Sequence, residues 1–236
     1  TPEIYTLSLH DALPIFGDDD GGDDGQAHRV SIVGAAPRVR LRDVATAQCI
    51  AMPDCLHRLT PHASHTPPGM AVTVQLTSRD DGGLQLEYRL SGPAAALRVP
   101  PLRLAAPADD LWRHTCCELL VALAGMPGYR EFNFSPSRQW AVYDFDAYRQ
   151  RSETVPPRWS ADVRVEGGAD GVVLRVAIAP TLLPGNGTQP LQVALSAVLE
   201  HADGALSYWA LRHPAGQPDF HHRESFSLIL PAACRA

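Results

Sequence analysis

Aromatic and polar side chains alternate in the segment YREFNF. If this segment is a strand, Phe132 and Phe134 share one face, and Tyr129, Glu131 and Asn133 share the other. The two phenylalanines are expected in a core. The opposite face then carries a ring, a carboxyl group and an amide in one row. A sugar site needs this mixture, because the ring packs on C–H groups while the polar groups bond hydroxyls.

A second carboxyl group, Glu118, precedes this segment. If Glu118 also points away from the core, it could lie near Glu131. Alternatively, both carboxyl groups bond loops or pair with arginines such as Arg113 and Arg130. Two carboxyl groups also suggest a glycosidase, but sequence spacing cannot give their separation in space. The sequence therefore leaves catalysis uncertain and favours binding without chemistry.

Tryptophans are the candidate aromatic platforms. Trp112 follows a polar, proline-rich segment and lies close to His114, so it could line the mouth of a pocket. For Trp140 and Trp209, a place in the core is an equally good interpretation.

The histidines and cysteines do not form a recognisable metal or disulfide pattern. On an extended chain the adjacent His221 and His222 point in opposite directions. His114 and Cys116 could share a strand face, but they supply only two ligands, so no metal site is expected. The count of five cysteines is odd, and Cys116 and Cys117 are adjacent. Reduced thiols and a cytoplasmic location are therefore expected.

Composition excludes several classes of function. All 20 basic residues are arginine, which rules out lysine-dependent sites such as a Schiff base or a P-loop. A net charge of −6 argues against a nucleic-acid partner. No apolar run reaches about 18 residues, so no membrane partner is expected.

The first part of the sequence differs from the rest. Residues 5–15, YTLSLHDALPI, resemble one reading frame of a short-read sequencing adapter, and an Asp/Gly-rich run follows them. Residues 1–51 are therefore predicted to be a disordered or artefactual extension. Residues 52–236 are predicted to be the folded domain, with Met52 as a plausible start.

The folded part is predicted to be all-β. Short runs with period-two alternation are separated by turn signals, among them DDGG at 80–83 and GGADG at 167–171. We expect an antiparallel β-sandwich of about ten strands, jelly-roll or immunoglobulin-like. The expected strands are 71–77, 84–90, 117–123, 129–134, 140–145, 161–166, 172–178, 191–199, 207–211 and 226–230.

Several motifs resemble the bacterial DOMON-like family, in its MurB-like branch, which is related to the family 9 carbohydrate-binding modules. They are LTPH at 59–62, WRHTCCE at 112–118, YREFNFSPS at 129–137, LSYWAL at 206–211 and PDFHH at 218–222. Two positions depart from the family pattern. Cys117 replaces a more usual aromatic residue, and Arg138 stands where glycine is common, which puts the turn before Trp140 in doubt.

The resemblance implies a ligand-binding sandwich without catalysis, most plausibly for a carbohydrate or glycan fragment. The alternatives are a haem-binding electron-transfer module and a structural or protein-binding sandwich. Haem would need methionine and histidine ligands, and neither Met70 nor Met126 lies in a recognisable haem motif. No cofactor is therefore expected. The predicted ligand-binding residues are Trp112, His114, Glu118, Glu131, Asn133, Trp140, Phe220 and His221.

Overall fold

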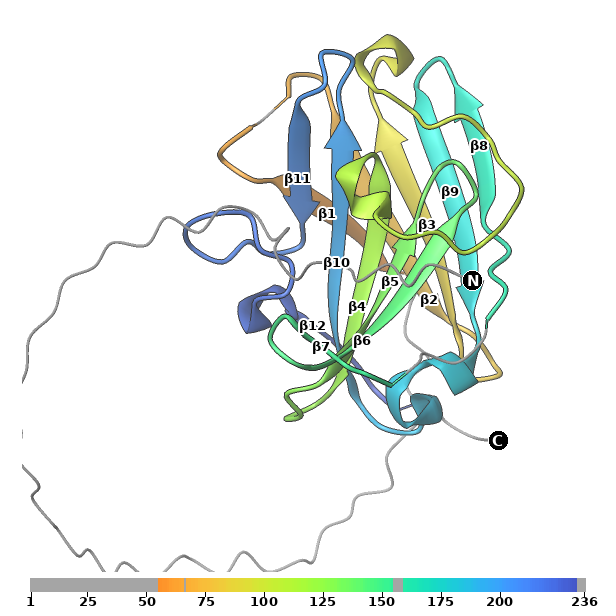
Figure 1. Cartoon of the computed structure of the whole chain (residues 1–236), viewed down its shortest axis with the longest axis vertical. Helices are drawn as coiled ribbons and strands as arrows, with labels where there is room; N and C mark the ends of the chain where they lie inside the picture. Colours follow the sequence, from red (N-terminus) through yellow and green to blue (C-terminus); the bar gives the residue numbers. More distant parts are fainter. Residues whose placement is uncertain (1–54, 66, 155–158, 233–236) are drawn as a thin grey trace, which may run out of the picture. The chain divides into compact units, whose positions relative to one another are not determined.

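The structure, a computed structural model, describes residues 55–65, 67–154 and 159–232 (Figure 1). The predictions made for residues 1–51 and for Met52 lie outside the described residues. Within the described part, the regular elements are strands and short 3-10 turns, and every ladder between two named strands is antiparallel. The all-β prediction is confirmed.

The strands follow the alternation of the sequence closely. They are β1 (Cys55–Pro61), β2 (Ala71–Ser78), β3 (Leu84–Ser91), β4 (Cys116–Leu123), β5 (Tyr129–Phe134), β6 (Trp140–Ala147), β7 (Gln150–Arg151), β8 (Arg164–Gly168), β9 (Gly171–Ile178), β10 (Leu191–Glu200), β11 (Leu206–Ala210) and β12 (Leu228–Leu230). The 3-10 turns are η1 (Ala94–Ala96), η2 (Leu111–Arg113), η3 (Pro180–Leu182), η4 (Pro184–Gly187) and η5 (Arg223–Ser225). No helix in the described residues is long and apolar enough to cross a membrane.

The strands form two sheets that share one strand. Sheet A has the order β1-β2-β3-β9-β8, and sheet B the order β7-β6-β5-β4-β10-β11, with β12 also paired to β10. β1 belongs to both, because residues 55–59 pair with β2 while Thr60 and Pro61 pair with β11. A strand that changes sheet in this way forms a corner of a sandwich.

The main core lies between the two sheets. It joins Val72, Leu86 and Leu174 of sheet A to Leu119 and Phe132 of sheet B, among other residues. Tyr88 of sheet A donates a hydrogen bond from its hydroxyl to the backbone oxygen of Glu118 in sheet B, at 2.6 Å. This packing confirms the predicted sandwich. It also confirms that the phenylalanines of β5 enter the core, since Phe132 and Phe134 are fully buried.

Two strands were not predicted. β1 has a mixed sequence with Leu56 exposed, and it gains its partners from β2 and from β11, about 150 residues later in the chain. β7 is only two residues long. The other strands were predicted, with boundaries displaced by up to three residues. The largest displacement is at β8, which begins at Arg164 rather than at 161.

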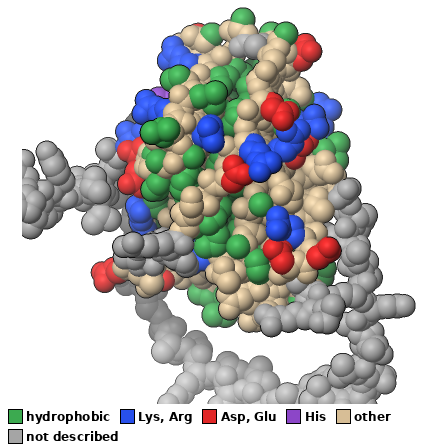
Figure 2. Space-filling model, turned by 90° about the vertical axis from the view of Figure 1, so that its right-hand side faces the viewer, with side chains coloured by type: hydrophobic (Ala, Val, Ile, Leu, Met, Phe, Trp, Pro, Cys, Tyr) green, Lys and Arg blue, Asp and Glu red, His purple; other side chains and the backbone are tan. Residues whose placement is uncertain are grey.

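The outer faces of the two sheets differ. On sheet A, charged side chains of both signs lie side by side, as Figure 2 shows for the side of the molecule that carries β8 and β9. Arg175 contacts both Glu87 and Glu166, and Arg89 also contacts Glu87. On sheet B, two small apolar clusters cover much of the outer face. The central strands β4, β5 and β10 are therefore buried on both sides.

Candidate functional site

The outer face of sheet B holds a row of buried polar side chains. Successive side chains of β4 point to opposite faces of sheet B. Cys117, Leu119 and Val121 enter the main core, so Glu118 points to the outer face. The strand register places Glu118 directly opposite Asn133 of β5 on one side and Ser196 of β10 on the other. Residues directly opposite each other have Cβ atoms about 5 Å apart. The polar row is therefore continuous across three strands.

Glu118 and Glu131 form a buried, interacting pair of carboxyl groups. Only 4% of Glu118 and 5% of Glu131 are exposed. Burial raises the pKa of Glu131 to about 7. Burial, and next the negative charge of Glu131, raise the pKa of Glu118 well above its usual value. Both effects favour the neutral form, so the pair retains a proton near neutral pH.

The carboxyl pair has few hydrogen-bond donors. The Asn133 amide donates from Nδ2 to Glu131 Oε1 at 2.8 Å, and the Ser196 hydroxyl donates to Glu118 Oε2 at 3.4 Å. Asn133 is fully buried, and within the described residues its Oδ1 atom has no hydrogen-bond partner. An unpaired buried carbonyl costs about 1–3 kcal/mol. The site therefore has an acceptor that a ligand's donor would satisfy.

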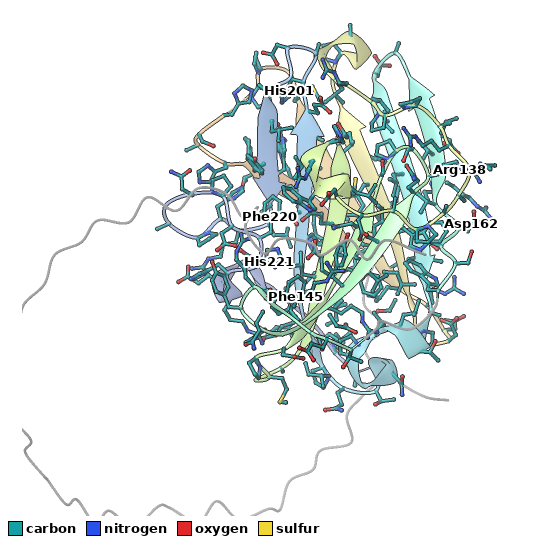
Figure 3. The ribbon with its side chains drawn as sticks, in the orientation of Figure 1. Arg138, Phe145, Asp162, His201, Phe220 and His221 are labelled. Atoms are coloured by element: carbon teal, nitrogen blue, oxygen red, sulfur yellow. The ribbon has the colours of Figure 1, made fainter. Side chains whose placement is uncertain are left out.

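Aromatic side chains and the C-terminal segment cover this face. Tyr129, Phe220 and Phe226 belong to one small apolar cluster, with Phe145 packed against it. The ring of Tyr129 stacks on Phe145 at 4.7 Å between centroids, and His221 lies 5.1 Å from the same phenylalanine. Figure 3 shows Phe145, Phe220 and His221 gathered in one region of the molecule.

The hydrogen bonds of Tyr129 define the state of His221. The Tyr129 hydroxyl accepts from the backbone N–H of Arg149 at 3.1 Å and lies 2.8 Å from His221 Nδ1. Its own proton then goes to Nδ1, which leaves the imidazole proton on Nε2. His221 Nε2 lies 3.8 Å from Glu131 Oε2. Burial, and next the charge of Arg149, lower the pKa of His221 to about 4, so the ring is neutral at pH 7.

A pair of contacts fixes the C-terminal segment to the turn between β6 and β7. Asp219 accepts hydrogen bonds from the Tyr148 hydroxyl at 2.6 Å and from the Arg149 guanidinium at 2.9 Å. Asp219 also accepts from the backbone N–H of His221 at 3.0 Å. These contacts hold His221 over the carboxyl pair.

The structure brings together five of the eight predicted site residues: Glu118, Glu131, Asn133, Phe220 and His221. Trp112 lies beside the same face, because its neighbour Leu111 packs with Cys116 and Tyr143 on it. Trp112 is half-buried, and the Arg113 guanidinium lies 5.1 Å from its ring.

Two predicted site residues lie elsewhere. Trp140 pairs with Phe134 across the hairpin, so its side chain enters the main core, where its ring lies 6.3 Å from that of Trp159. His114 is exposed, and its Nδ1 atom lies 2.7 Å from Oε2 of Glu200. Glu200 is the last residue of β10. The proposed pairing of the carboxyl groups with Arg130 is also wrong, because Arg130 pairs with Asp144 at 2.6 Å.

Several residues around the pair were not predicted. Ser196 could have been found from the alternation of β10, which places it on the outer face. Arg151 lies over the ring of Tyr143, at 4.3 Å from its centroid, and Tyr143 donates to Asp109. Arg149 carried no sequence signal, and Asp219 stood out only as part of the PDFHH motif. Their contact joins segments that lie 70 residues apart, so the sequence did not reveal it.

Within the described residues, no group of three or more His, Cys, Asp or Glu side chains is arranged to hold a metal ion. Met70 is buried in the core between the sheets, and Met126 is exposed in the β4–β5 turn. Met70 could therefore reach a haem iron only if the core opened.

Comparisons with known proteins support the fold. No family model matches the chain, and no curated protein matches it. The chain is similar to the crystal structure of a "putative carbohydrate-binding protein" from Bacteroides uniformis, with a TM-score of 0.52 and 13% sequence identity. The similarity covers 73% of this chain and 84% of that one. At this identity it shows a shared β-sandwich fold, and the DOMON-like resemblance stays a prediction.

Proposed function

We propose that the described domain binds a carbohydrate without catalysing its conversion, and that the ligand contacts the outer face of sheet B around Glu118, Glu131 and Asn133. One observation carries the proposal. A two-sheet sandwich needs to bury only the inner face of each sheet, yet here the outer face of sheet B also buries two carboxyl groups and an amide with an unpaired oxygen. Such a cluster lowers stability, which is consistent with selection for binding.

The chemistry of the cluster fits a polyol. Carboxyl and amide oxygens accept hydrogen bonds from hydroxyl groups, and Asn133 Oδ1 is available for one. Aromatic rings lie at the edge of the cluster, among them Tyr129 and Phe145, and Trp112 belongs to η2, which lies against β4 and β5. Rings of this kind pack against the C–H face of a sugar. The fold shared with the Bacteroides protein agrees with this assignment.

The cover over the site sets how the ligand enters. His221 lies against Glu131, and Phe220 packs in the neighbouring apolar cluster. Their segment is fixed by several contacts, among them those of Asp219 and of Arg223. The ligand reaches Glu131 when this segment shifts away from the carboxyl pair. The ligand then occupies the position that His221 holds in the structure. Weak binding is expected, because a sugar exchanges hydrogen bonds with water for hydrogen bonds with the protein.

The test is calorimetric titration with a panel of neutral and amino mono- and oligosaccharides. For a sugar that binds, Glu118→Gln and Asn133→Ala are each expected to weaken binding about fivefold, the effect of about 1 kcal/mol. Glu166→Gln is the control, because Glu166 is exposed on sheet A, and it should not change the affinity. Melting temperatures of all three variants show whether they fold.

Two results would contradict the proposal. If no sugar binds, the cluster is structural and the outer face of sheet B serves the fold or a protein partner. If a sugar is cleaved, and Glu131→Gln abolishes the cleavage, the domain is a hydrolase that uses the carboxyl pair.

A further inference from the structure

The carboxyl pair differs from other buried or partly buried carboxylates of the described residues. Glu87, Asp144, Glu200 and Asp219 each contact an arginine. Within the described residues, the contacts of Glu118 and Glu131 are with Ser196, Asn133 and His221. Buried charges in proteins are normally paired with an opposite charge. Among the described residues the pair lacks such a partner, and the proton that it retains stands in for one.

The protein's own cations near the pair are engaged elsewhere. The Arg149 guanidinium bonds Asp219, and Arg151 lies over the ring of Tyr143. His221 accepts a hydrogen bond at Nδ1 from Tyr129, so it carries a single proton and no charge. Among the residues that the structure describes, these contacts leave the carboxyl pair without a cation in direct contact.

The acceptors of the cluster match the donors of an ammonium group. Glu118 and Glu131 each keep one oxygen beyond those bonded to Ser196 and Asn133, and Asn133 Oδ1 is unpaired. These three acceptors come from neighbouring positions on two paired strands. An ammonium group has three N–H donors and one positive charge. A hydroxyl group offers a single donor and no charge.

We propose that the ligand of this site is an amino sugar, bound through its ammonium group by Glu118, Glu131 and Asn133. The inference rests on the carbohydrate-binding function proposed above and names the class of sugar. An N-acetylated sugar binds less well, because its amide nitrogen is neutral and has one donor. Hydrogen bonds to charged groups are about twice as strong as neutral ones.

The test compares matched pairs of methyl glycosides at pH 7: glucosamine with glucose, galactosamine with galactose, and mannosamine with mannose. In at least one pair the amino sugar is expected to bind the full-length protein about tenfold or more tighter than its neutral partner. N-acetylglucosamine should bind no tighter than glucose. Glu131→Gln and Glu118→Gln should each reduce the preference to within about twofold, and Glu166→Gln should retain it.

Each outcome decides a different point. If amino and neutral sugars bind equally, the amino-sugar inference is wrong and the proposed function stands. If the preference survives in both glutamine variants, the ammonium group binds elsewhere, and the inference is also wrong. If neither member of any pair binds, both the proposed function and the inference are wrong. Because glutamine retains the size of glutamate, a melting curve for each variant confirms that it is folded.

Discussion

Glu131 and His221 illustrate how burial sets the charge of single residues in this domain. They lie 3.8 Å apart, and burial favours the neutral form of both. Their effects on stability oppose each other. Glu131 keeps its proton on folding. Its contribution to the free energy of unfolding therefore falls as pH rises from about 4.5 to about 7. His221 loses its proton on folding. Its contribution to the free energy of unfolding therefore increases as pH rises from about 4 to about 6.5.

Replacing Glu131 with glutamine separates the two contributions. The variant keeps the acceptor for Asn133 and removes the titrating group, while His221 still titrates. The unfolding free energy of Glu131→Gln minus that of the unchanged protein should therefore increase by about 1–3 kcal/mol between pH 5 and pH 8. Urea denaturation at the two pH values measures this difference. A difference that does not change with pH would show that Glu131 titrates normally.

Arg138 holds a backbone conformation that suits glycine. Its φ is 76°, in the left-handed region, and it is exposed in the turn between β5 and β6 (Figure 3). A side chain there costs about 1 kcal/mol. Arg138→Gly is expected to stabilise the domain by about 0.5–1 kcal/mol, although glycine also loses more entropy on folding. Arg138→Ala keeps the Cβ atom and should give no such gain. Equal melting temperatures for the two variants would contradict this reasoning.

At the scale of elements, alternation and turns determine most of the structure. Every expected strand exists, because period-two patterns and Gly/Asp turns act locally along the chain. The face assignment of β5 was also predictable, since Phe132 and Phe134 can only share one side. This assignment located Glu131 and Asn133 correctly on the outer face.

The remaining features depend on contacts between distant segments. The strand character of β1 comes from β2 and β11, which its own sequence does not reveal. The place of Trp140 follows from its register opposite Phe134, which the length of the intervening turn sets. The cover by Phe220 and His221 depends on contacts of the C-terminal segment with distant residues, among them that of Asp219 with Arg149. Periodicity within one strand cannot predict any of these three.

The β8–β9 hairpin gives a test at this scale. Gly171 has a φ of +133°, and a Cβ atom there would lie 1.9 Å from the backbone oxygen of Leu90. Gly171→Ala is expected to cost about 2 kcal/mol or more, because the backbone of β3 cannot move away cheaply. Gly168, its partner in the ladder, has open space around its Cβ position. Gly168→Ala should be nearly neutral in a thermal melt, and an equal loss in both variants would contradict the predicted clash.

Across the whole domain, the two outer sheet faces have different roles. The outer face of sheet A carries partly exposed ion pairs, such as Arg175 with Glu166. The outer face of sheet B is buried over its central strands and carries the candidate site. Exposed ion pairs contribute about 0–1 kcal/mol. Glu166→Gln is therefore expected to change the unfolding free energy by less than about 1 kcal/mol in chemical denaturation. A loss of several kcal/mol would show that sheet A also depends on its outer face.

The most direct test of the account is an NMR titration of the isotope-labelled protein with the sugars of the panel. We expect the largest shifts at Glu118, Glu131, the side-chain amide of Asn133 and His221. In Asn133→Ala, the shifts of the other three residues should need about fivefold more sugar to reach half of their maximum. Residues on the outer face of sheet A, such as Glu87 and Arg175, should not shift. Shifts confined to sheet A, or no shifts with any sugar, would contradict the claim that the outer face of sheet B is a carbohydrate site.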